Sequence, residues 1–86
     1  MSAAAVVMYT TGWCPYCERA RKLLASKNVS FDEINLESQP DKRAEMQTRS
    51  GRRTVPQIFI GERHVGGCDD LQALEDAGSL DGLLGR

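Results

Sequence analysis

A short apolar run leads directly into a helix that begins at a pair of cysteines, and this feature constrains the fold more than any other. Ala3–Tyr9 is continuously apolar and is bounded by Thr10–Gly12, a pattern typical of a strand that is buried on both faces. From Cys14 to Asn28 the period changes to that of an amphipathic helix, and Pro15 suits its first position. The apolar face of this predicted helix carries Cys17, Ala20, Leu23 and Leu24.

Strands and helices continue to alternate along the rest of the chain. Ser30–Leu36 mixes apolar and charged residues and predicts a second strand, which should be parallel to the first because a helix connects them. The other predicted elements are a helix over Asp41–Ser50 ended by Gly51, a strand over Gln57–Ile60, a short hairpin strand at His64-Val65, a helix capped by Asp69 or Asp70 that runs to Gly78, and a final turn over Leu80–Leu84. We therefore expect an α/β fold of order β-α-β-α-β-β-α, with a mixed four-stranded sheet flanked by helices.

Length and charge exclude several classes of protein. A chain of 86 residues buries about 60–65% of its surface on folding, which suffices for one core, so we expect a single domain over residues 1–86. Eleven basic and twelve acidic residues give a net charge of −1, which argues against a dedicated nucleic-acid binder. No apolar run approaches the ~18 residues of a membrane span, and no basic segment precedes the first strand, so we expect a protein of the reducing cytoplasm.

The cysteines favour redox chemistry. Three cysteines, an odd number, do not fit a secreted domain stabilised by disulfides. At a helix N-terminus, Cys14 would face unpaired backbone N–H groups and the positive end of the helix dipole, and both favour the thiolate that attacks disulfides. Cys17 follows one helical turn later and should be the more buried thiol. It could therefore attack a mixed disulfide on Cys14 without any rearrangement of the chain.

A zinc site is the alternative for these cysteines. Cys14, Cys17, His64 and Cys68 offer three thiols and an imidazole, a set that zinc accepts. However, the residues between the first two cysteines begin a helix instead of the usual small-residue knuckle, and a histidine on a short edge strand ordinarily faces solvent. We therefore expect no metal site.

The segment Thr54–Gln57 precedes the third predicted strand and contains Pro56. A proline at the first residue of a strand is ordinarily trans, and the local sequence alone favours that interpretation. Beside a cysteine pair in a βαβ unit, however, we expect a cis Val55–Pro56 bond. Such a turn would leave the N–H and C=O of Val55 free to bind an extended peptide as an added strand.

Two regions of opposite charge are predicted to face a common site. Lys42–Arg53 holds five basic residues and one acidic residue, whereas Asp69–Arg86 holds five acidic residues and one basic residue. Between them, Gly66–Asp70 is a glycine turn that enters a helix whose start could hold a carboxylate, while Asp69 or Asp70 could bind an amino group or only cap the helix. A zwitterionic peptide would suit such a site, and solvated helix faces are the alternative.

Three separated motifs together resemble the dithiol glutaredoxins of the thioredoxin superfamily, and most of all their small bacterial type. The motifs are Tyr9-Thr10 followed by Cys14-Pro15-Tyr16-Cys17, then Thr54-Val55-Pro56-Gln57-Ile58-Phe59-Ile60, then Gly66-Gly67-Cys68-Asp69-Asp70-Leu71. They stand in the order and at the spacing of that family, and the similarity covers nearly the whole chain. The resemblance implies a thioredoxin fold and glutathione-dependent disulfide reduction, with glutathione as co-substrate and no permanently bound cofactor.

The same resemblance implies a role for each matching residue. Cys14 would be the nucleophile and Cys17 the resolving thiol. The residues implied to bind glutathione are Tyr16 at its flank, Thr54 and Val55 along its backbone, Pro56 as the cis proline, Gly67, Cys68 and Asp69 at its γ-glutamyl end, and Arg52, with Gln57 less certainly, at its glycine carboxylate.

Two reaction routes follow from the resemblance. In the dithiol route Cys14 attacks a substrate disulfide, Cys17 releases the reduced substrate, and two glutathiones restore the dithiol. In the monothiol route Cys14 alone takes glutathione from a glutathionylated protein, and a second glutathione regenerates it. The implied partners are glutathione, disulfide-bearing or glutathionylated proteins and, through glutathione, glutathione reductase. We expect a monomer that binds neither nucleic acid nor membranes.

An iron–sulfur carrier is the alternative function. It would be a dimer that holds a 2Fe–2S cluster with Cys14 of each subunit and two glutathiones. Relatives of this kind usually have glycine or serine in place of Pro15, so Pro15 disfavours the cluster. A thioredoxin-like reductase served by an NADPH-dependent flavoenzyme is a further alternative.

Overall fold

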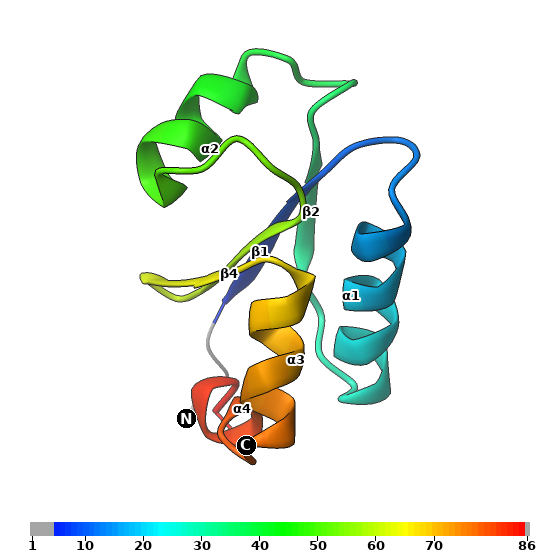
Figure 1. Ribbon diagram of the computed structural model, residues 1–86, viewed down its shortest axis with the longest axis vertical. Coiled ribbons are helices and arrows are strands. Elements are labelled where there is room, and N and C mark those ends of the chain that lie inside the picture. The colour runs from blue at the N-terminus through cyan, green and yellow to red at the C-terminus, as the bar shows by residue number, and fades with distance from the viewer. Residues whose placement is uncertain (1–4, 86) are drawn as a thin grey trace.

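The computed structural model describes residues 5–85 of the chain. Within this range the elements are β1 (Val6–Thr10), α1 (Pro15–Ser26), β2 (Asp32–Asn35), α2 (Lys42–Ser50), β3 (Gln57–Ile60), β4 (Arg63–Gly66), α3 (Cys68–Asp76) and α4 (Leu80–Leu83) (Figure 1). The predicted order of elements is confirmed, and α4 is the predicted final turn. The start of the predicted first strand, Ala3-Ala4, lies outside the described residues. No helix within the described range is long and apolar enough to cross a membrane.

The sheet is mixed, as predicted, with the strand order β2-β1-β3-β4. β1 runs parallel to β2 and antiparallel to β3, and β3 and β4 form the predicted hairpin. The register pairs Tyr9, near the end of β1, with Gln57 at the start of β3. Because β1 and β3 are antiparallel, the loop after β1, which leads to Cys14, and the loop before β3, which contains Pro56, meet at the same end of these strands. About forty positions separate the two loops in the sequence.

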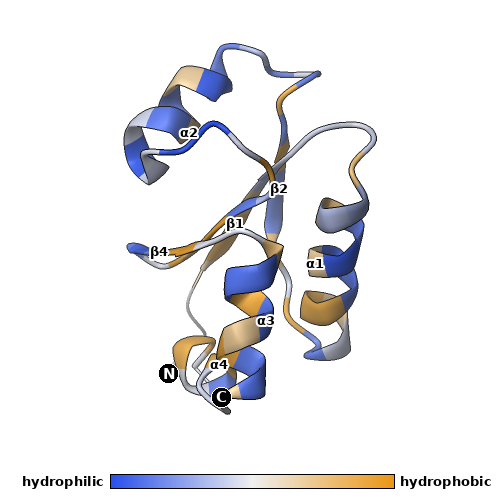
Figure 2. Cartoon of the chain, in the orientation of Figure 1, coloured by the Kyte–Doolittle hydropathy of each residue, from blue (hydrophilic) through white to orange (hydrophobic). Residues whose placement is uncertain are grey.

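Alternation along β1 divides the core between the two faces of the sheet. Val6 and Met8 belong to a cluster with buried residues of α1, α3 and α4, such as Leu24. Tyr9 belongs to a second cluster that includes Met46 of α2. Figure 1 shows α1 and α3 side by side on one side of the sheet and α2 on the other, and Figure 2 shows that most of α2 is hydrophilic. Met46 is the buried residue by which α2 packs on the sheet.

Several element boundaries differ from the predicted ones for reasons of local hydrogen bonding. β2 begins at Asp32 instead of Ser30. It ends at Asn35, one residue before the predicted Leu36, because the Asn35 side chain accepts hydrogen bonds from the N–H groups of Glu37 and Ser38 and so begins a turn. α2 ends at Ser50, and Gly51 terminates it as predicted, with the φ of Gly51 at 71° and its N–H donating to the Gln47 carbonyl.

The start of α3 corrects another prediction. Neither Asp69 nor Asp70 is the N-cap residue, because the helix begins at Cys68 and is preceded by Gly67. Asp70 instead lies in the first turn and reaches back, and its Oδ2 accepts a hydrogen bond of 2.9 Å from the Gly67 N–H. The helix ends at Asp76, two residues before the predicted Gly78.

Candidate active site

Cys14 occupies the N-cap position of α1, immediately before the first helical residue, Pro15. Its backbone is extended, with φ at −159° and ψ at 107°, and its Sγ accepts a hydrogen bond of 3.2 Å from the Cys17 N–H. This N–H is one of the donors that a helix leaves unpaired in its first turn. The predicted placement of Cys14 at the helix N-terminus is therefore confirmed.

Cys17 lies behind Cys14 on the side of α1 that packs on the sheet. Its side chain is fully buried, whereas that of Cys14 is half-buried, so the predicted order of exposure is confirmed. Burial and the hydrogen bond to Cys14 raise the pKa of the Cys17 thiol above its ordinary value, against a smaller opposing effect of the Thr11 backbone and Arg21. An incoming disulfide therefore meets Cys14 before Cys17.

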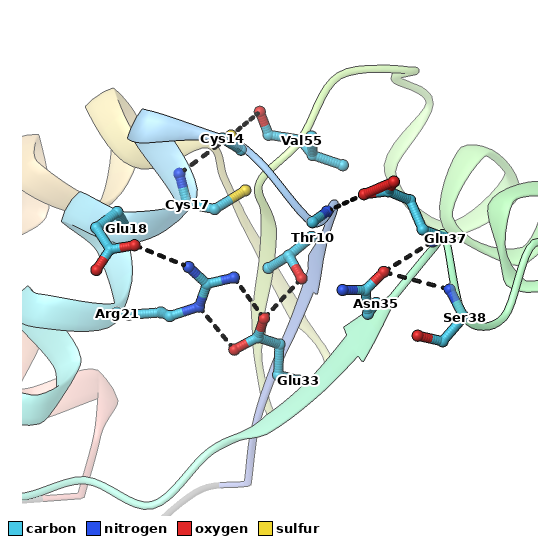
Figure 3. A network of polar contacts seen from close by, with 11 residues as sticks. Thr10, Cys14, Cys17, Glu18, Arg21, Glu33, Asn35, Glu37, Ser38 and Val55 are labelled. Carbon is cyan, nitrogen blue, oxygen red and sulfur yellow. Dashed lines mark hydrogen bonds and ion pairs between the residues drawn. The ribbon is translucent and has the colours of Figure 1, made fainter.

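The loop before β3 lies against the Cys14 thiol. The Val55–Pro56 bond is cis, as predicted, and Pro56 is buried. The Val55 carbonyl oxygen is 3.9 Å from Cys14 Sγ and accepts its S–H, as Figure 3 shows. A peptide that extended along Val55 would therefore run directly past the thiol.

A cavity of about 440 Å³ opens beside this contact. The residues that line it are Tyr16, Arg52, Thr54, Val55, Pro56, Gly67, Cys68, Asp69 and Asp70. The fold thus brings together eight of the nine residues to which the sequence resemblance assigned glutathione binding, from three separate segments of the chain. Cys14 borders the cavity through its contact with Val55 and does not line it.

Groups of opposite charge meet at the rim of this cavity. Arg52 Nη1 lies 3.0 Å from Asp70 Oδ2, and both side chains are about half exposed. The Gly67 N–H, and then Arg52, hold the pKa of the Asp70 carboxyl below its usual range. The predicted positive and negative regions therefore adjoin each other here, and Arg52 already contacts a carboxylate.

Gln57 does not line the cavity, in contrast to the expectation that it contacts a glycine carboxylate. Its side chain is fully buried, its amide Nε2 donates to Thr54 Oγ1 at 3.2 Å, and its Oε1 lies 2.6 Å from His64 Nε2. Sequence analysis missed this chain of contacts. The predicted hairpin was the available signal, because it places His64 on the strand that neighbours Gln57.

The zinc alternative finds no support among residues 5–85. Within that range no three histidine, cysteine, aspartate or glutamate side chains come together as a metal-binding group. His64 contacts Gln57 and stacks at 4.9 Å on the Phe59 ring instead of approaching the cysteines.

A second network that sequence analysis missed lies behind the cysteine pair. Arg21 of α1 forms two hydrogen bonds with the Glu33 carboxylate of β2, and Glu33 also accepts a hydrogen bond from the buried Thr10 hydroxyl (Figure 3). The residue pattern of each element, taken separately, could not predict that Arg21 of α1 contacts Glu33 of β2.

The glutaredoxin family profile matches residues 6–65, well over half of the chain. This chain belongs to the glutaredoxin family. The glutaredoxin is 62% identical to Glutaredoxin from Pseudomonas aeruginosa over 79 residues, which cover 92% of this chain and 94% of that relative. It is 58% identical to Glutaredoxin 3 from Escherichia coli (strain K12) over 81 residues, which cover 94% and 98% of the two chains.

Solved structures agree with this assignment. The crystal structure of a buckwheat glutaredoxin–glutathione complex matches with a TM-score of 0.87 at 32% identity, over 94% of this glutaredoxin and 76% of that chain. The predicted thioredoxin fold and the predicted family are therefore both confirmed. As a member of this family, the protein is a thiol oxidoreductase, and Cys14 and Cys17 are its close cysteine pair.

Proposed function

We propose that this glutaredoxin is a glutathione-dependent enzyme that reduces protein disulfides and glutathione mixed disulfides through Cys14 and Cys17. The observation that carries the proposal is the cavity of about 440 Å³ beside the half-buried Cys14 thiol, with charged groups of both signs at its rim. Glutathione is a small extended peptide with two carboxylates and one ammonium group, and it needs both signs of charge and a free backbone edge. The match to a buckwheat protein described as a glutaredoxin–glutathione complex supports the proposal.

In this proposal, each part of glutathione meets a group of matching chemistry. Its backbone pairs with Val55, which brings its sulfur to Cys14. Its γ-glutamyl carboxylate binds at the start of α3, near Gly67, where backbone N–H groups favour an anion. Its glycine carboxylate competes with Asp70 for Arg52, since those two side chains now form an ion pair of 3.0 Å.

The proposed dithiol reaction has two steps on the protein. The Cys14 thiolate attacks one sulfur of the substrate disulfide, a mixed disulfide forms, and the departing thiolate takes a proton from water. Cys17 then gives up its proton and attacks Cys14, the mixed disulfide breaks, and the second substrate thiol leaves. Two glutathiones restore the dithiol and become glutathione disulfide, which glutathione reductase reduces with NADPH.

The proposed monothiol reaction needs only Cys14. Its thiolate attacks the glutathione sulfur of a glutathionylated protein, and the protein thiol leaves. A second glutathione then attacks the glutathione bound to Cys14 and restores the thiolate. Cys17 takes no part, since no disulfide within the protein forms.

Turnover of a small glutathione mixed disulfide, coupled to glutathione reductase and NADPH, tests the proposal. We expect Cys14→Ser to abolish both reactions, because serine is not a nucleophile toward disulfides at neutral pH. We expect Cys17→Ser to lose reduction of protein disulfides but to keep deglutathionylation at a rate similar to the wild-type protein. A Cys17→Ser protein unable to deglutathionylate would contradict this division of roles, and absence of turnover by the wild-type protein would contradict the glutathione dependence.

We also propose that the chain acts as a single-domain monomer in the cytoplasm, without a permanently bound cofactor. Sedimentation of the purified protein tests the monomer. Visible absorption after anaerobic purification tests the alternative of a cluster carrier, and a coloured dimer would contradict the proposal.

A further inference from the structure

The network behind Cys17 has a structural origin in the pairing of β1 with β2. Met8 is paired with Glu33, so Thr10, two residues further along β1, points to the same face of the sheet as Glu33. This is the face that α1 covers. Thr10 Oγ1 donates to Glu33 Oε2 at 2.7 Å, and Arg21 donates to the same carboxylate through Nε at 2.8 Å and Nη2 at 2.6 Å.

This double contact fixes the Arg21 side chain. A guanidinium that meets a carboxylate with two parallel bonds has a defined direction as well as a charge. The Arg21 and Glu33 side chains are each 28% exposed, so solvent screens the pair only in part. Glu18, one turn before Arg21, adds a longer contact of 3.5 Å from the solvent side.

The fixed guanidinium lies next to the resolving cysteine. Arg21 follows Cys17 by four residues in α1, so the two side chains occupy the same face of the helix. In Figure 3 the guanidinium lies between the Cys17 sulfur and the Glu33 carboxylate, so the positive end of the ion pair is the one nearer to the sulfur. The charge of Arg21 accordingly opposes the increase that burial causes in the pKa of Cys17.

We propose that Arg21, held by Glu33, is a positioning residue for the resolving step and stabilises the Cys17 thiolate in an otherwise buried site. The inference rests on the proposed function, because it concerns the disulfide exchange that Cys14 and Cys17 perform. Without this cation, Cys17 would have to form its anion in a fully buried position, where only the Thr11 backbone among the named groups opposes the effect of burial.

The effect applies to the step in both directions. When Cys17 attacks a Cys14–glutathione mixed disulfide, its thiolate forms the new bond with the Cys14 sulfur, and glutathione leaves as a thiolate that takes a proton. When glutathione attacks the Cys14–Cys17 disulfide at Cys14, the Cys17 thiolate is the leaving group. A cation beside Cys17 makes it a more abundant nucleophile in the first case and a better leaving group in the second.

The experiment separates the Cys14 step from the Cys17 step in one reaction. Reduced protein is mixed with oxidised glutathione at pH 7, quenched with acid at successive times, and examined by mass spectrometry. The glutathione adduct reports attack by Cys14, and its conversion to the lighter intramolecular disulfide reports attack by Cys17. The variants are Arg21→Gln, Arg21→Lys and, as a matched control, Lys22→Gln, which removes an exposed cation from the next position of the same helix.

We expect Arg21→Gln to slow only the conversion of the adduct. Loss of the neighbouring cation should lower the fraction of Cys17 that is present as thiolate by about tenfold. The Cys17 thiolate that remains should be about threefold more nucleophilic, so conversion of the adduct to the intramolecular disulfide should slow about threefold. Formation of the adduct should not change, and neither should either step in Lys22→Gln. Arg21→Lys should retain most of the conversion rate, because it keeps the charge.

Three results would overturn the inference. They are an unchanged conversion rate in Arg21→Gln, an equal slowing of both steps, and a loss in Arg21→Lys as large as in Arg21→Gln. Failure of the wild-type protein to form any adduct would instead overturn the proposed function. A partly unfolded variant would slow both steps, so equal slowing contradicts the inference only where the circular dichroism of Arg21→Gln is native. If it is not native, Arg21→Lys decides: a conversion rate close to that of the wild-type protein supports the inference, and a selective slowing of about threefold overturns it.

Discussion

Gln57 shows how one buried polar side chain can organise the rim of the candidate site. Its Nε2 donates to Thr54 Oγ1, so its Oε1 faces His64 and accepts a hydrogen bond from the ring Nε2–H. Thr54 lines the cavity, whereas Gln57 lies behind it. Gln57 therefore contacts the lining of the cavity through Thr54.

We predict that Gln57→Leu lowers the free energy of unfolding by about 1–3 kcal/mol, since it leaves two polar groups without their partner. It should also raise the apparent KM for glutathione with little change in kcat, because the Thr54 loop loosens while the cysteines stay in place. Urea unfolding and steady-state kinetics measure the two effects. Gln72→Leu is the control, since Gln72 is exposed and bonds only to Asp76 among the described residues. Equal stability of the two variants would contradict the prediction.

At the scale of elements, the junction of β4 and α3 depends on a glycine. Gly66 has φ at 118°, a conformation that side chains disfavour, and a Cβ there would collide with the Asp70 carboxylate. That carboxylate accepts hydrogen bonds from Gly67 and Arg52. A substitution at Gly66 would therefore disturb both the start of α3 and the charged rim of the cavity.

We predict that Gly66→Ala lowers the free energy of unfolding by about 1–3 kcal/mol, which is the usual cost of a strained backbone conformation. Gly82→Ala is the matched control, because Gly82 lies within α4 and an added Cβ would have no heavy atom within 4 Å. Alanine at this helical position should stabilise the protein by about 0.5–1 kcal/mol. Thermal or urea unfolding of both variants checks the pair, and a neutral Gly66→Ala would show that the Asp70 contacts do not constrain the turn.

At the scale of the whole molecule, several shifted groups act together on stability. Burial, and then the charge of Arg52, lower the pKa of His64, so the folded protein binds a proton there less readily than the unfolded chain. A hydrogen bond from Arg21 lowers the pKa of the Glu33 carboxyl, and a hydrogen bond from the Gly67 N–H lowers the pKa of the Asp70 carboxyl. All three groups therefore destabilise the folded state on acidification.

We predict that the free energy of unfolding falls in two stages as the pH decreases. The His64 contribution is complete above about pH 6.5 and is lost as the pH falls through the lowered pKa of the folded protein. The contributions of Glu33 and Asp70 are complete above about pH 4 and are lost below it. Urea unfolding between pH 7.5 and 3 measures both stages. His64→Gln should remove the first stage and keep the second. If the first stage persisted in this variant, a group other than His64 would be its cause.

Much of the molecule could be predicted because the signals for it are local. The switch from an apolar run to helical periodicity at Cys14 located β1 and α1, and Gly51 correctly marked the end of α2. Element boundaries were less accurate, because Asn35 and Asp70 end or begin elements through side-chain hydrogen bonds. Periodicity does not encode those bonds.

By itself, the sequence determined the order of the elements and the position of Cys14 at a helix N-terminus, because both follow from the patterns of neighbouring residues. The resemblance of its motifs to those of a family indicated most of the residues that line the cavity. Only the tertiary structure decided that Arg52 pairs with Asp70, that Gln57 is buried behind Thr54, and that the Arg21 guanidinium stands beside Cys17. These contacts join segments far apart in the chain or set the direction of a side chain, so they depend on strand register and on the placement of helices against the sheet.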